Sequence, residues 1–170
     1  MFKVDQDLVA RVSEKLTTQF GEAILSAEIA DDMPVYTVKR EIITALLKFL
    51  YEDESLQFRF LTDLCGIQYP EAELPFGVIY HLHSFTQNLR IRVKSFAPAD
   101  DPVFPTATTV FAAANWMERE TFDFFGIIFE GHPNLKRILN MEDMDYFPMR
   151  KEYPLEDDTR EDKDDKMFGR

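Results

Sequence analysis

The chain is short of cysteine, glycine and basic residues, and each shortage excludes a class of function. Cys65 is the only cysteine in 170 residues, so they can hold neither an internal disulfide nor a four-cysteine iron–sulfur or zinc site. The six glycines form neither G-x-G-x-x-G nor G-x-x-x-x-G-K, the nucleotide-binding fingerprints. A G-x-S-x-G nucleophile elbow is also missing, so the sequence shows no recognisable catalytic motif.

Basic residues are outnumbered, with 19 lysines and arginines against 31 acids and a formal net charge of −12. This balance disfavours nucleic acid and anionic lipid as partners, because both are bound through a surplus of Lys and Arg. No apolar run approaches the ~18–20 residues of a membrane-spanning helix, and the acids in residues 1–16 are untypical of a signal peptide. We therefore expect a soluble protein of a reducing compartment, the cytoplasm.

Apolar and aromatic residues are plentiful, at 45% and 14% of the total. At this length they predict one folded domain with a substantial core. Apolar residues recur every four positions from Val4 to Phe20, and Gly21 follows them, which predicts an N-terminal helix with a glycine cap. The next predicted elements are strands at 23–30 and 33–38 and a helix at 39–51.

Alternation predicts half-buried strands in the middle of the sequence. One strand should place Phe58, Phe60, Thr62 and Leu64 on a single face. A hairpin should follow, with arms at 78–86 and 89–96 joined by a two-residue turn at 87–88. That turn places Leu82 opposite Val93 and Ser84 opposite Ile91, which keeps the apolar side chains together.

Two polar groups share the other face of this hairpin. His81 and His83 point the same way, but they lack a third ligand, so we expect solvent-facing positions rather than a metal site. Arg90, Arg92 and Lys94 form a basic row in an acidic protein. This row is either a solvated sheet face or a patch for an acidic partner segment.

Residues 110–125 are predicted to form a helix with two apolar arcs. Glu120 lies within one arc and Glu118 within the other. The first arc holds Ala113, Trp116, Met117 and Phe124, and the second holds Phe111, Phe122 and Phe125. A surface helix of a lone domain has one apolar stripe. The second arc therefore indicates a neighbouring protein.

The charges of this helix need partners if they are enclosed, because a buried lone charge costs several kcal/mol. Arg119 and Asp123, four residues apart, are able to pair. Other nearby cations are His132, Lys136 and Arg137. Two less favoured readings are a charged helix edge in solvent, and catalysis by Glu120, Asp123 and His132. The second has no H-E-x-x-H spacing to support a zinc site.

The stretch ERETFDFFGIIFEGHPNLKRIL resembles the signature of the NuoC-like family, the C-type subunits of the proton-pumping NADH–quinone oxidoreductase, respiratory complex I. The matching positions are Glu118, Arg119, Glu120, Asp123, Phe124, Phe125, Gly126, Gly131, His132, Pro133, Arg137, Ile138 and Leu139. FPMRKEYPL is similar to the family's tail element, G-x-P-L-R-K-D-[YF]-P. It matches at Arg150, Lys151, Tyr153 and Pro154 and departs at Phe147, Met149 and Glu152. The whole resemblance covers residues 23–155.

The resemblance implies an α+β fold, a two-layer sandwich of helices on a mixed β-sheet over residues 1–140. It also implies an extended, partly acidic tail over residues 141–170 that docks on a partner subunit. The chain would sit in the peripheral arm on the cytoplasmic side of the bacterial inner membrane, held there only through partners. Those partners would be the D-type subunit, which helps to form the quinone site, and nearby iron–sulfur subunits.

Subunits of this family carry no redox centre, so the resemblance implies no catalytic, cofactor or metal residue here. FMN and iron–sulfur clusters would belong to partner subunits, and the assembled complex would handle NADH and quinone. The signature positions, with Lys136, would then serve the interface, and we expect residues 118–123 and 132–137 to form an ionic network there. Three alternatives stay open: the equivalent subunit of a complex-I-like membrane-bound hydrogenase, a free-standing metal hydrolase, and a soluble binding module unrelated to respiration.

Overall fold

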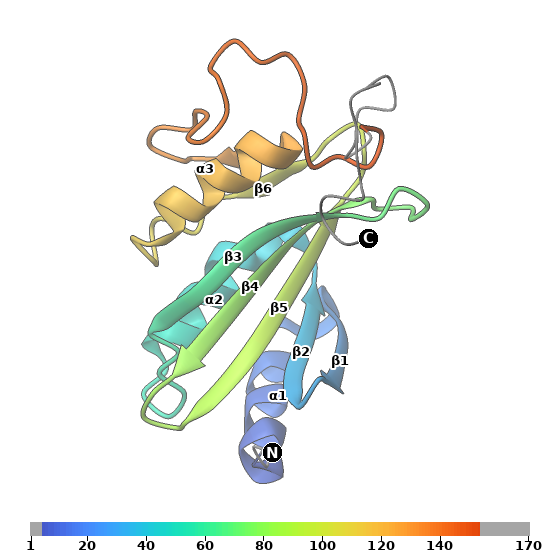
Figure 1. Ribbon diagram of the computed structural model, residues 1–170. Coiled ribbons are helices and arrows are strands. Elements are labelled where there is room, and N and C mark those ends of the chain that lie inside the picture. The colour runs from blue at the N-terminus through green and yellow to red at the C-terminus, as the bar shows by residue number, and fades with distance from the viewer. Residues whose placement is uncertain (1–4, 154–170) are drawn as a thin grey trace, which may run out of the picture.

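A five-stranded mixed sheet forms the centre of the protein. The structure is a computed structural model that describes residues 5–153. The strands are β1 (Ile24–Ala30), β2 (Met33–Val38), β3 (Phe60–Gln68), β4 (Phe76–Ser84) and β5 (Leu89–Ala97). Their order is β1-β2-β5-β4-β3, with β2 and β5 parallel and the other neighbouring pairs antiparallel. Helices α1 (Gln6–Phe20) and α2 (Ile43–Glu52) lie on one face of the sheet (Figure 1), so the predicted α+β fold is confirmed.

Both helices are amphipathic, because their apolar residues recur on one face of the helix. α1 buries Leu8, Val12 and Leu16, as the four-residue spacing predicted. Each such aliphatic side chain stabilises the fold by about 1.5–3 kcal/mol on burial. The Asp5 carboxylate caps the first turn, and Gly21 ends the helix at φ +51°. α2 follows a short 3₁₀ turn, η2 (Arg40–Ile42), and buries Ile43, Leu46, Leu47 and Leu50.

The third helix, α3 (Ala114–Phe125), begins four residues later than predicted. The N–H groups of Val110 and Phe111 bond to the Ala107 carbonyl in a separate turn that precedes the helix. α3 packs on β3 at Gly66, where a β-carbon would lie 2.7 Å from the Phe125 ring. Two three-residue strands, β6 (Val103–Pro105) and β7 (Ile128–Glu130), pair in parallel beside it. They were not predicted, because three residues are too few to show a period.

The hairpin of β4 and β5 has a longer turn than predicted. Four residues, 85–88, join the strands, so Ser84 pairs with Leu89 and Leu82 with Ile91. The predicted register was therefore wrong by two residues. Side chains still lie on the expected faces, because the faces of a strand alternate with a period of two. Asn88 takes a left-handed conformation (φ +49°), which Asn tolerates better than most residues.

The predicted single face of β3 was also wrong. Leu64 is buried but Phe60 is exposed, and the buried Phe58 precedes the strand. The pairing of β3 with β4 shifts between Leu61 and Asp63, which is a bulge. A bulge inserts one residue and reverses the alternation, and nothing in the local pattern of the sequence shows it.

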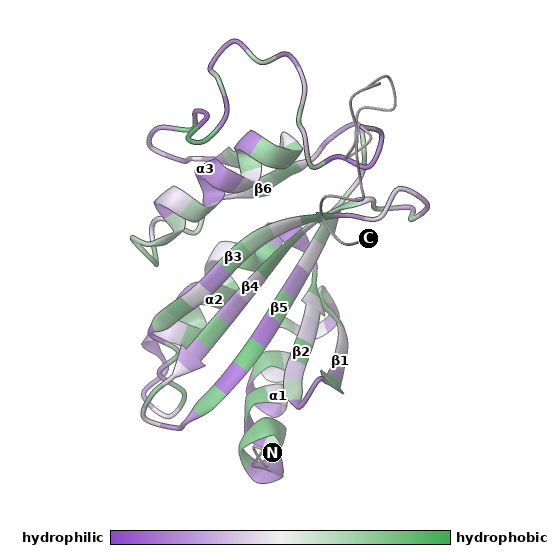
Figure 2. Ribbon diagram, in the orientation of Figure 1, coloured by the Kyte–Doolittle hydropathy of each residue, from purple (hydrophilic) through white to green (hydrophobic). Residues whose placement is uncertain are grey.

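No helix of the described residues covers the opposite face of the sheet. The basic row of Arg90, Arg92 and Lys94 lies there, as predicted, and alternates with buried apolar residues along β5. Figure 2 shows this alternation along the strand. His81 lies beside the row, and its Nε2 accepts a hydrogen bond of 2.8 Å from Arg92 Nε. Burial is the main cause that lowers the pKa of His81, followed by the charge of Arg92.

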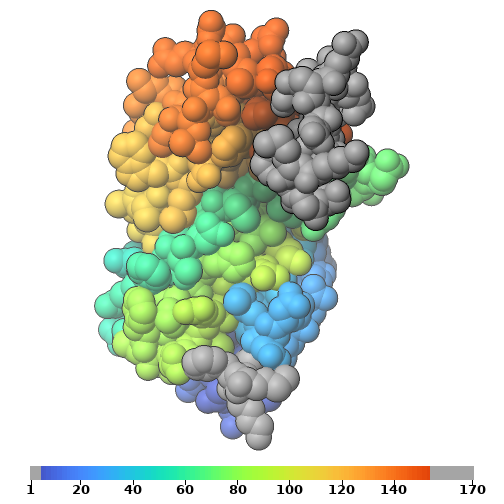
Figure 3. All heavy atoms as spheres, in the orientation of Figure 1, coloured from blue at the N-terminus to red at the C-terminus, as the bar shows by residue number. Residues whose placement is uncertain are grey.

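The chain after β7 passes over α3 on the side away from the sheet (Figure 1). In Figure 3 this segment and α3 form one continuous surface at the upper end of the molecule. The Met149 N–H donates to the Phe124 carbonyl (3.1 Å), and the Lys151 N–H donates to Gln68 Oε1 (2.7 Å). Residues 141–153 therefore pack on the domain itself, whereas the rest of the predicted tail lies outside the described residues.

Candidate functional site

Asp123 is the centre of the signature segment. Its carboxylate is fully buried on α3 and accepts five hydrogen bonds. Oδ2 receives the N–H groups of Ile138, Leu139 and Asn140 at 3.0, 2.7 and 2.9 Å. Oδ1 receives Arg137 Nη1 at 2.8 Å and Asn140 Nδ2 at 3.1 Å. Burial acts to raise the pKa of Asp123, but these donors outweigh it and hold the pKa well below the ordinary value.

Arg137, not Arg119, is the ionic partner of Asp123. The predicted pair at four-residue spacing was wrong, because a partner from the following loop occupies the carboxylate. The second terminal nitrogen of Arg137, Nη2, donates to the carbonyls of Met144 (2.8 Å) and Tyr146 (2.9 Å). Arg137 thus joins α3 to the segment that passes over it.

Arg119 forms a second connection between α3 and the loop that follows β7. Its Nε donates to the Lys136 carbonyl and its Nη2 to the Arg137 carbonyl, each at 3.1 Å. The guanidinium also lies 5.3 Å from the centre of the Trp116 ring. This cation–π contact restrains Trp116, a residue that is 61% exposed.

A third set of contacts joins the end of α3 to the segment that passes over it. The helix ends at Gly126, which is in the left-handed conformation (φ +71°). Arg150 Nε donates to the Phe125 carbonyl at 2.7 Å. The Phe147 ring lies within 4.9 Å of Arg137 and 4.7 Å of Arg150. A β-carbon on Gly126 would lie 2.5 Å from that ring, so only glycine leaves room for it.

The residues that depart from the family pattern take part in these contacts. Phe147 lies between the two guanidinium groups just described. Glu152 lies 3.6 Å from Arg150 Nη1 and accepts a hydrogen bond of 3.3 Å from Gln68 Nε2. Tyr153 packs against Tyr146, with ring centres 5.1 Å apart. Pro154, the last predicted position, lies outside the described residues.

Glu118 is fully buried but has no cationic partner among the described residues. Its carboxylate accepts hydrogen bonds of 2.6 Å from Thr106 Oγ1 and from the Ala107 N–H. Burial raises the pKa of Glu118 to about 7, and the two hydrogen bonds oppose that rise. The expected pairing with a cation was therefore wrong. Neutral donors from a distant loop satisfy the group, and no spacing in the sequence indicated them.

The residues of the metal-hydrolase alternative do not converge. Glu120 is exposed, and the oxygens of Asp123 are occupied by N–H donors. His132 Nε2 lies 3.1 Å from the Asn115 carbonyl, and its Nδ1 accepts the Asn134 N–H. Within residues 5–153, no three His, Cys, Asp or Glu side chains are grouped to hold a metal ion.

Large apolar side chains remain exposed beside this network. Trp116 on α3 is 61% exposed, and Leu139 and Met141 on the following loop are 65% and 68% exposed. We refer to these three residues as the α3 outer patch. Pro133 and Lys136 are also exposed on that loop, and Gly131 precedes them at φ +82°. A contiguous group of exposed apolar residues is typical of an interface.

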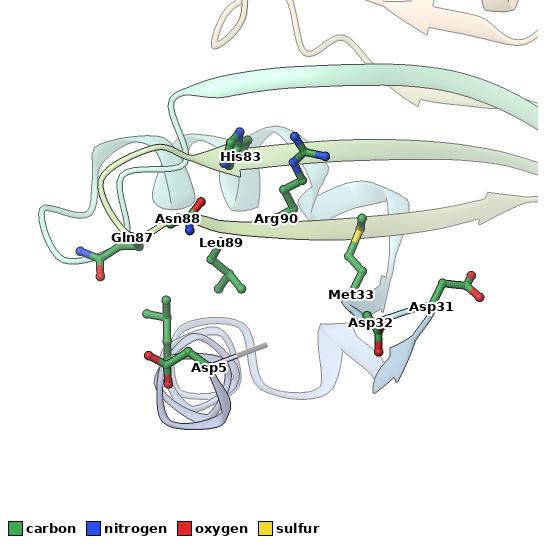
Figure 4. Close-up of a pocket in the computed structure, with 10 residues that line it drawn as sticks. Asp5, Asp31, Asp32, Met33, His83, Gln87, Asn88, Leu89 and Arg90 are labelled. Carbon is green, nitrogen blue, oxygen red and sulfur yellow. The ribbon is translucent and has the colours of Figure 1, made fainter. Parts of the chain in front are cut away.

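A cavity of about 440 Å³ lies elsewhere, between α1, the β1–β2 turn and the β4–β5 turn (Figure 4). Asp5, Asp31 and Asp32 line it together with His83 and Arg90. None of the signature residues reaches this cavity, so the signature does not form a ligand pocket here.

A protein-family model named "Respiratory-chain NADH dehydrogenase, 30 Kd subunit" matches residues 36–159. The chain belongs to this family. The C-type subunit of NADH-quinone oxidoreductase from Roseiflexus sp. (strain RS-1) is 47% identical over 86% of this chain and 84% of that protein. The corresponding subunit of Methylorubrum populi is 40% identical over 88% of this chain and 68% of that protein.

Two solved structures share the fold of this chain. The trypsin-resistant fragment of Nqo5 is 29% identical in sequence to this chain and gives a TM-score of 0.62. It covers 74% of this chain and 99% of its own length. A chain of an archaeal membrane-bound sulfane sulfur reductase gives a TM-score of 0.73 at 21% identity, over 86% and 85% of the two chains. That second likeness shows a shared fold only. As a family member, the chain is a subunit of a respiratory NADH dehydrogenase and works with other subunits of that complex.

Proposed function

We propose that this chain is a non-redox structural subunit of the peripheral arm of proton-translocating NADH–quinone oxidoreductase. It supports electron transfer from NADH to quinone by docking on the quinone-site subunit, the D-type subunit, near the iron–sulfur subunits. Membership of the family supports a place in this complex. The single cysteine in the sequence supports the proposal that the chain holds no iron–sulfur cluster of its own. FMN and the clusters belong to the partner subunits.

The observation that carries this proposal is the α3 outer patch and the way it is fixed. Arg119 and Asp123 hold the loop of Leu139 against α3 through backbone hydrogen bonds. Fixing an interface before binding reduces the conformational entropy lost on association. The network thus presents Trp116, Leu139 and Met141 as a preformed docking surface for the quinone-site subunit.

Membrane attachment in this proposal comes from the partners. Among the described residues, no helix is both long and apolar enough to cross a bilayer. The net charge of −12 disfavours direct binding to anionic lipid. We place the chain on the cytoplasmic side of the bacterial inner membrane, held there by the complex.

Replacing Arg119 with alanine tests the docking surface. The variant should keep its secondary structure, but the amount of assembled complex in native gels of solubilised membranes should fall several-fold. Arg40→Ala is the matched control, because Arg40 also donates to two backbone carbonyls, those of Asp101 and Val103, at another part of the fold. Equal assembly and equal quinone reduction in both variants would contradict the proposal.

A second candidate is the equivalent subunit of a complex-I-like membrane-bound hydrogenase. The fold shared with the sulfane sulfur reductase chain shows that this architecture also occurs outside NADH dehydrogenases. The partners distinguish the two. A flavin-binding NADH-oxidising subunit that copurifies with the chain supports the first proposal, and a hydrogen-activating subunit in its place supports the second.

A further inference from the structure

The basic row of Arg90, Arg92 and Lys94 on β5 lies on the face of the sheet opposite α1 and α2, and the proposed function does not use it. In Figure 4 Arg90 points away from α1, whereas its neighbour Leu89 points toward that helix. The neighbouring strands place no acid directly beside the row. The residues paired with it are Ile79, His81 and His83 on β4 and Val35 and Thr37 on β2.

Ion pairs compensate little of the charge of this row within residues 5–153. Arg92 Nη1 lies 3.8 Å from a carboxylate oxygen of Asp31, whose side chain is 85% exposed, so this pair contributes little. Arg90 and Lys94 form no ion pair with a described residue. The row therefore keeps an excess of positive charge, in a chain whose net charge is −12.

Two further acids of this face lie at its borders. Glu28 on β1 and Asp63 on β3 are each separated from β5 by one strand. Asp63 lies 3.6 Å from His81. The pKa values of His81 and His83 are nevertheless both lowered, by burial first and then by the charge of the neighbouring arginine. The border acids thus do not cancel the positive charge of the row.

The complementary charge occurs in the sequence at residues 156–165, which we call the acidic segment. This segment holds seven acids and two bases, and it begins with three consecutive acids. It starts three residues beyond Tyr153, the last residue that the structure describes. Opposite charges arranged in two such groups favour a specific contact between them.

The described chain ends near one end of β5. The Lys151 N–H donates to Gln68 at 2.7 Å, and Gln68 lies in line, across β4, with Ala97, the last residue of β5. Lys94 and Arg90 lie three and seven residues back along this strand, at about 10 and 23 Å. An extended chain spans at most about 3.3–3.6 Å per residue, so the acids of the segment can lie about 10–40 Å beyond the last described residue. The row is therefore within their reach.

We propose that the acidic segment of this chain lies on the basic row of its own sheet and excludes other acidic segments from it. A short tether gives an effective concentration on the order of millimolar, so an acidic stretch of another protein meets the row only by displacing the segment. Added salt weakens the contact, because the Debye length falls from ~10 Å at 0.1 M to ~3 Å at 1 M. The inference does not rest on the proposed function, since neither group belongs to the α3 outer patch.

Paramagnetic relaxation in nuclear magnetic resonance tests the contact in the full chain. A nitroxide on Thr159→Cys, in a Cys65→Ser background, lies within the acidic segment. It should broaden the amide signals of residues 90–94 several-fold more than those of α2, which lies on the other face of the sheet. This difference should disappear at 1 M salt. It should also disappear in the row variant, Arg90→Gln with Lys94→Gln.

The matched control variant is Arg11→Gln with Lys48→Gln. It removes the same two charges from exposed positions on α1 and α2, the helices of the other face. The broadening of residues 90–94 should stay at the wild-type level in this variant. A change in net charge alone would affect both variants equally.

Two results of this experiment overturn the proposal. Equal broadening on both faces of the sheet, or broadening that 1 M salt leaves unchanged, shows that the row does not hold the segment. The second result comes from mixing an isotope-labelled chain without nitroxide and an unlabelled chain that carries it. Broadening of residues 90–94 in that mixture places the segment of one copy on the row of another, and not on its own sheet.

Competition tests the exclusion of other acidic segments, with a fluorescent octaglutamate peptide as the probe. Replacing each Asp of the acidic segment with Asn and each Glu with Gln should strengthen binding of this probe several-fold. Adding the row substitutions should remove that gain, whereas adding the control substitutions should not. Equal affinity of the wild-type chain and the neutralised variant contradicts the exclusion, as does a gain that both sets of substitutions remove equally.

Discussion

At the scale of single residues, α3 contains two buried carboxylates whose pKa values are shifted in opposite directions. Asp123 accepts charge-assisted and backbone hydrogen bonds, which favour its charged form. Glu118 has only two neutral donors, so burial dominates and favours its protonated form. The environment, and not the residue type, therefore decides which of the two is ionised near neutral pH.

Glu118 should make stability depend on pH between about 4.5 and 7. Its pKa in the folded state, about 7, lies above the ordinary 4.5, so the folded protein binds the extra proton in this range. Stability is then greatest below pH 4.5 for this group and falls as pH rises, by up to about 3 kcal/mol. Glu118→Gln should remove this slope in urea unfolding between pH 5 and 8. An unchanged slope would contradict the assignment.

Asp123→Asn should destabilise the fold by about 3–5 kcal/mol, because it leaves Arg137 buried without its anion. The lowered pKa means that the ionised group stabilises the fold above the ordinary pKa and loses this effect as pH falls. Unfolding free energies of the variant should therefore change less between pH 5 and 3 than those of the wild type. Asp63→Asn is the control: Asp63 is exposed and 3.6 Å from His81, so its loss should cost less than ~1 kcal/mol.

The sequence indicates the important charges of α3 but not all of their partners. Arg119 and Asp123 could be placed on one helix from their spacing, yet each bonds to the loop of residues 136–140. Such partners depend on how a loop folds back, and a helical period carries no information about that. The neutral donors of Glu118, Thr106 and Ala107, lie 12 and 11 residues away in a separate loop.

At the scale of elements, the segment of residues 141–153 belongs structurally with α3. The sequence shows no periodicity there, and it was expected to form part of a tail. The structure instead fixes it through single contacts at Arg137, Phe147 and Arg150. Elements with a clear period, such as α1 and β5, were predicted well, whereas a bulge and a four-residue turn changed the details of β3 and of the hairpin.

Gly126→Ala should release this segment from α3. The left-handed conformation costs alanine about 1–2 kcal/mol, and the new methyl group would also displace Phe147 and Arg150. Trypsin should then cleave after Arg150 or Lys151 several-fold faster than in the wild type.

The matched control is Gly21→Ala, since Gly21 also has a positive φ (+51°) but has nothing within 4 Å of the added atom. This variant should also lose stability, because alanine is disfavoured at φ +51° and ψ −125°, but cleavage at Arg150 should not become faster. Equal cleavage rates in the two glycine variants would show that the contacts at Gly126 do not hold the segment.

At the scale of the whole molecule, the fold leaves a group of apolar side chains, the α3 outer patch, exposed beside the arginine network of α3. In the proposed function this patch meets the quinone-site subunit. Its loss should therefore reduce assembly of the complex and leave the fold of the free chain intact.

The central claim is that this chain is a structural member of a respiratory NADH dehydrogenase that docks on the quinone-site subunit. Affinity purification of the tagged chain from detergent-solubilised native membranes, followed by mass spectrometry, tests it most directly. The quinone-site subunit and the cysteine-rich iron–sulfur subunits should copurify with the wild-type chain and be depleted with Arg119→Ala. Recovery of the wild-type chain alone, with no such subunits, would contradict it.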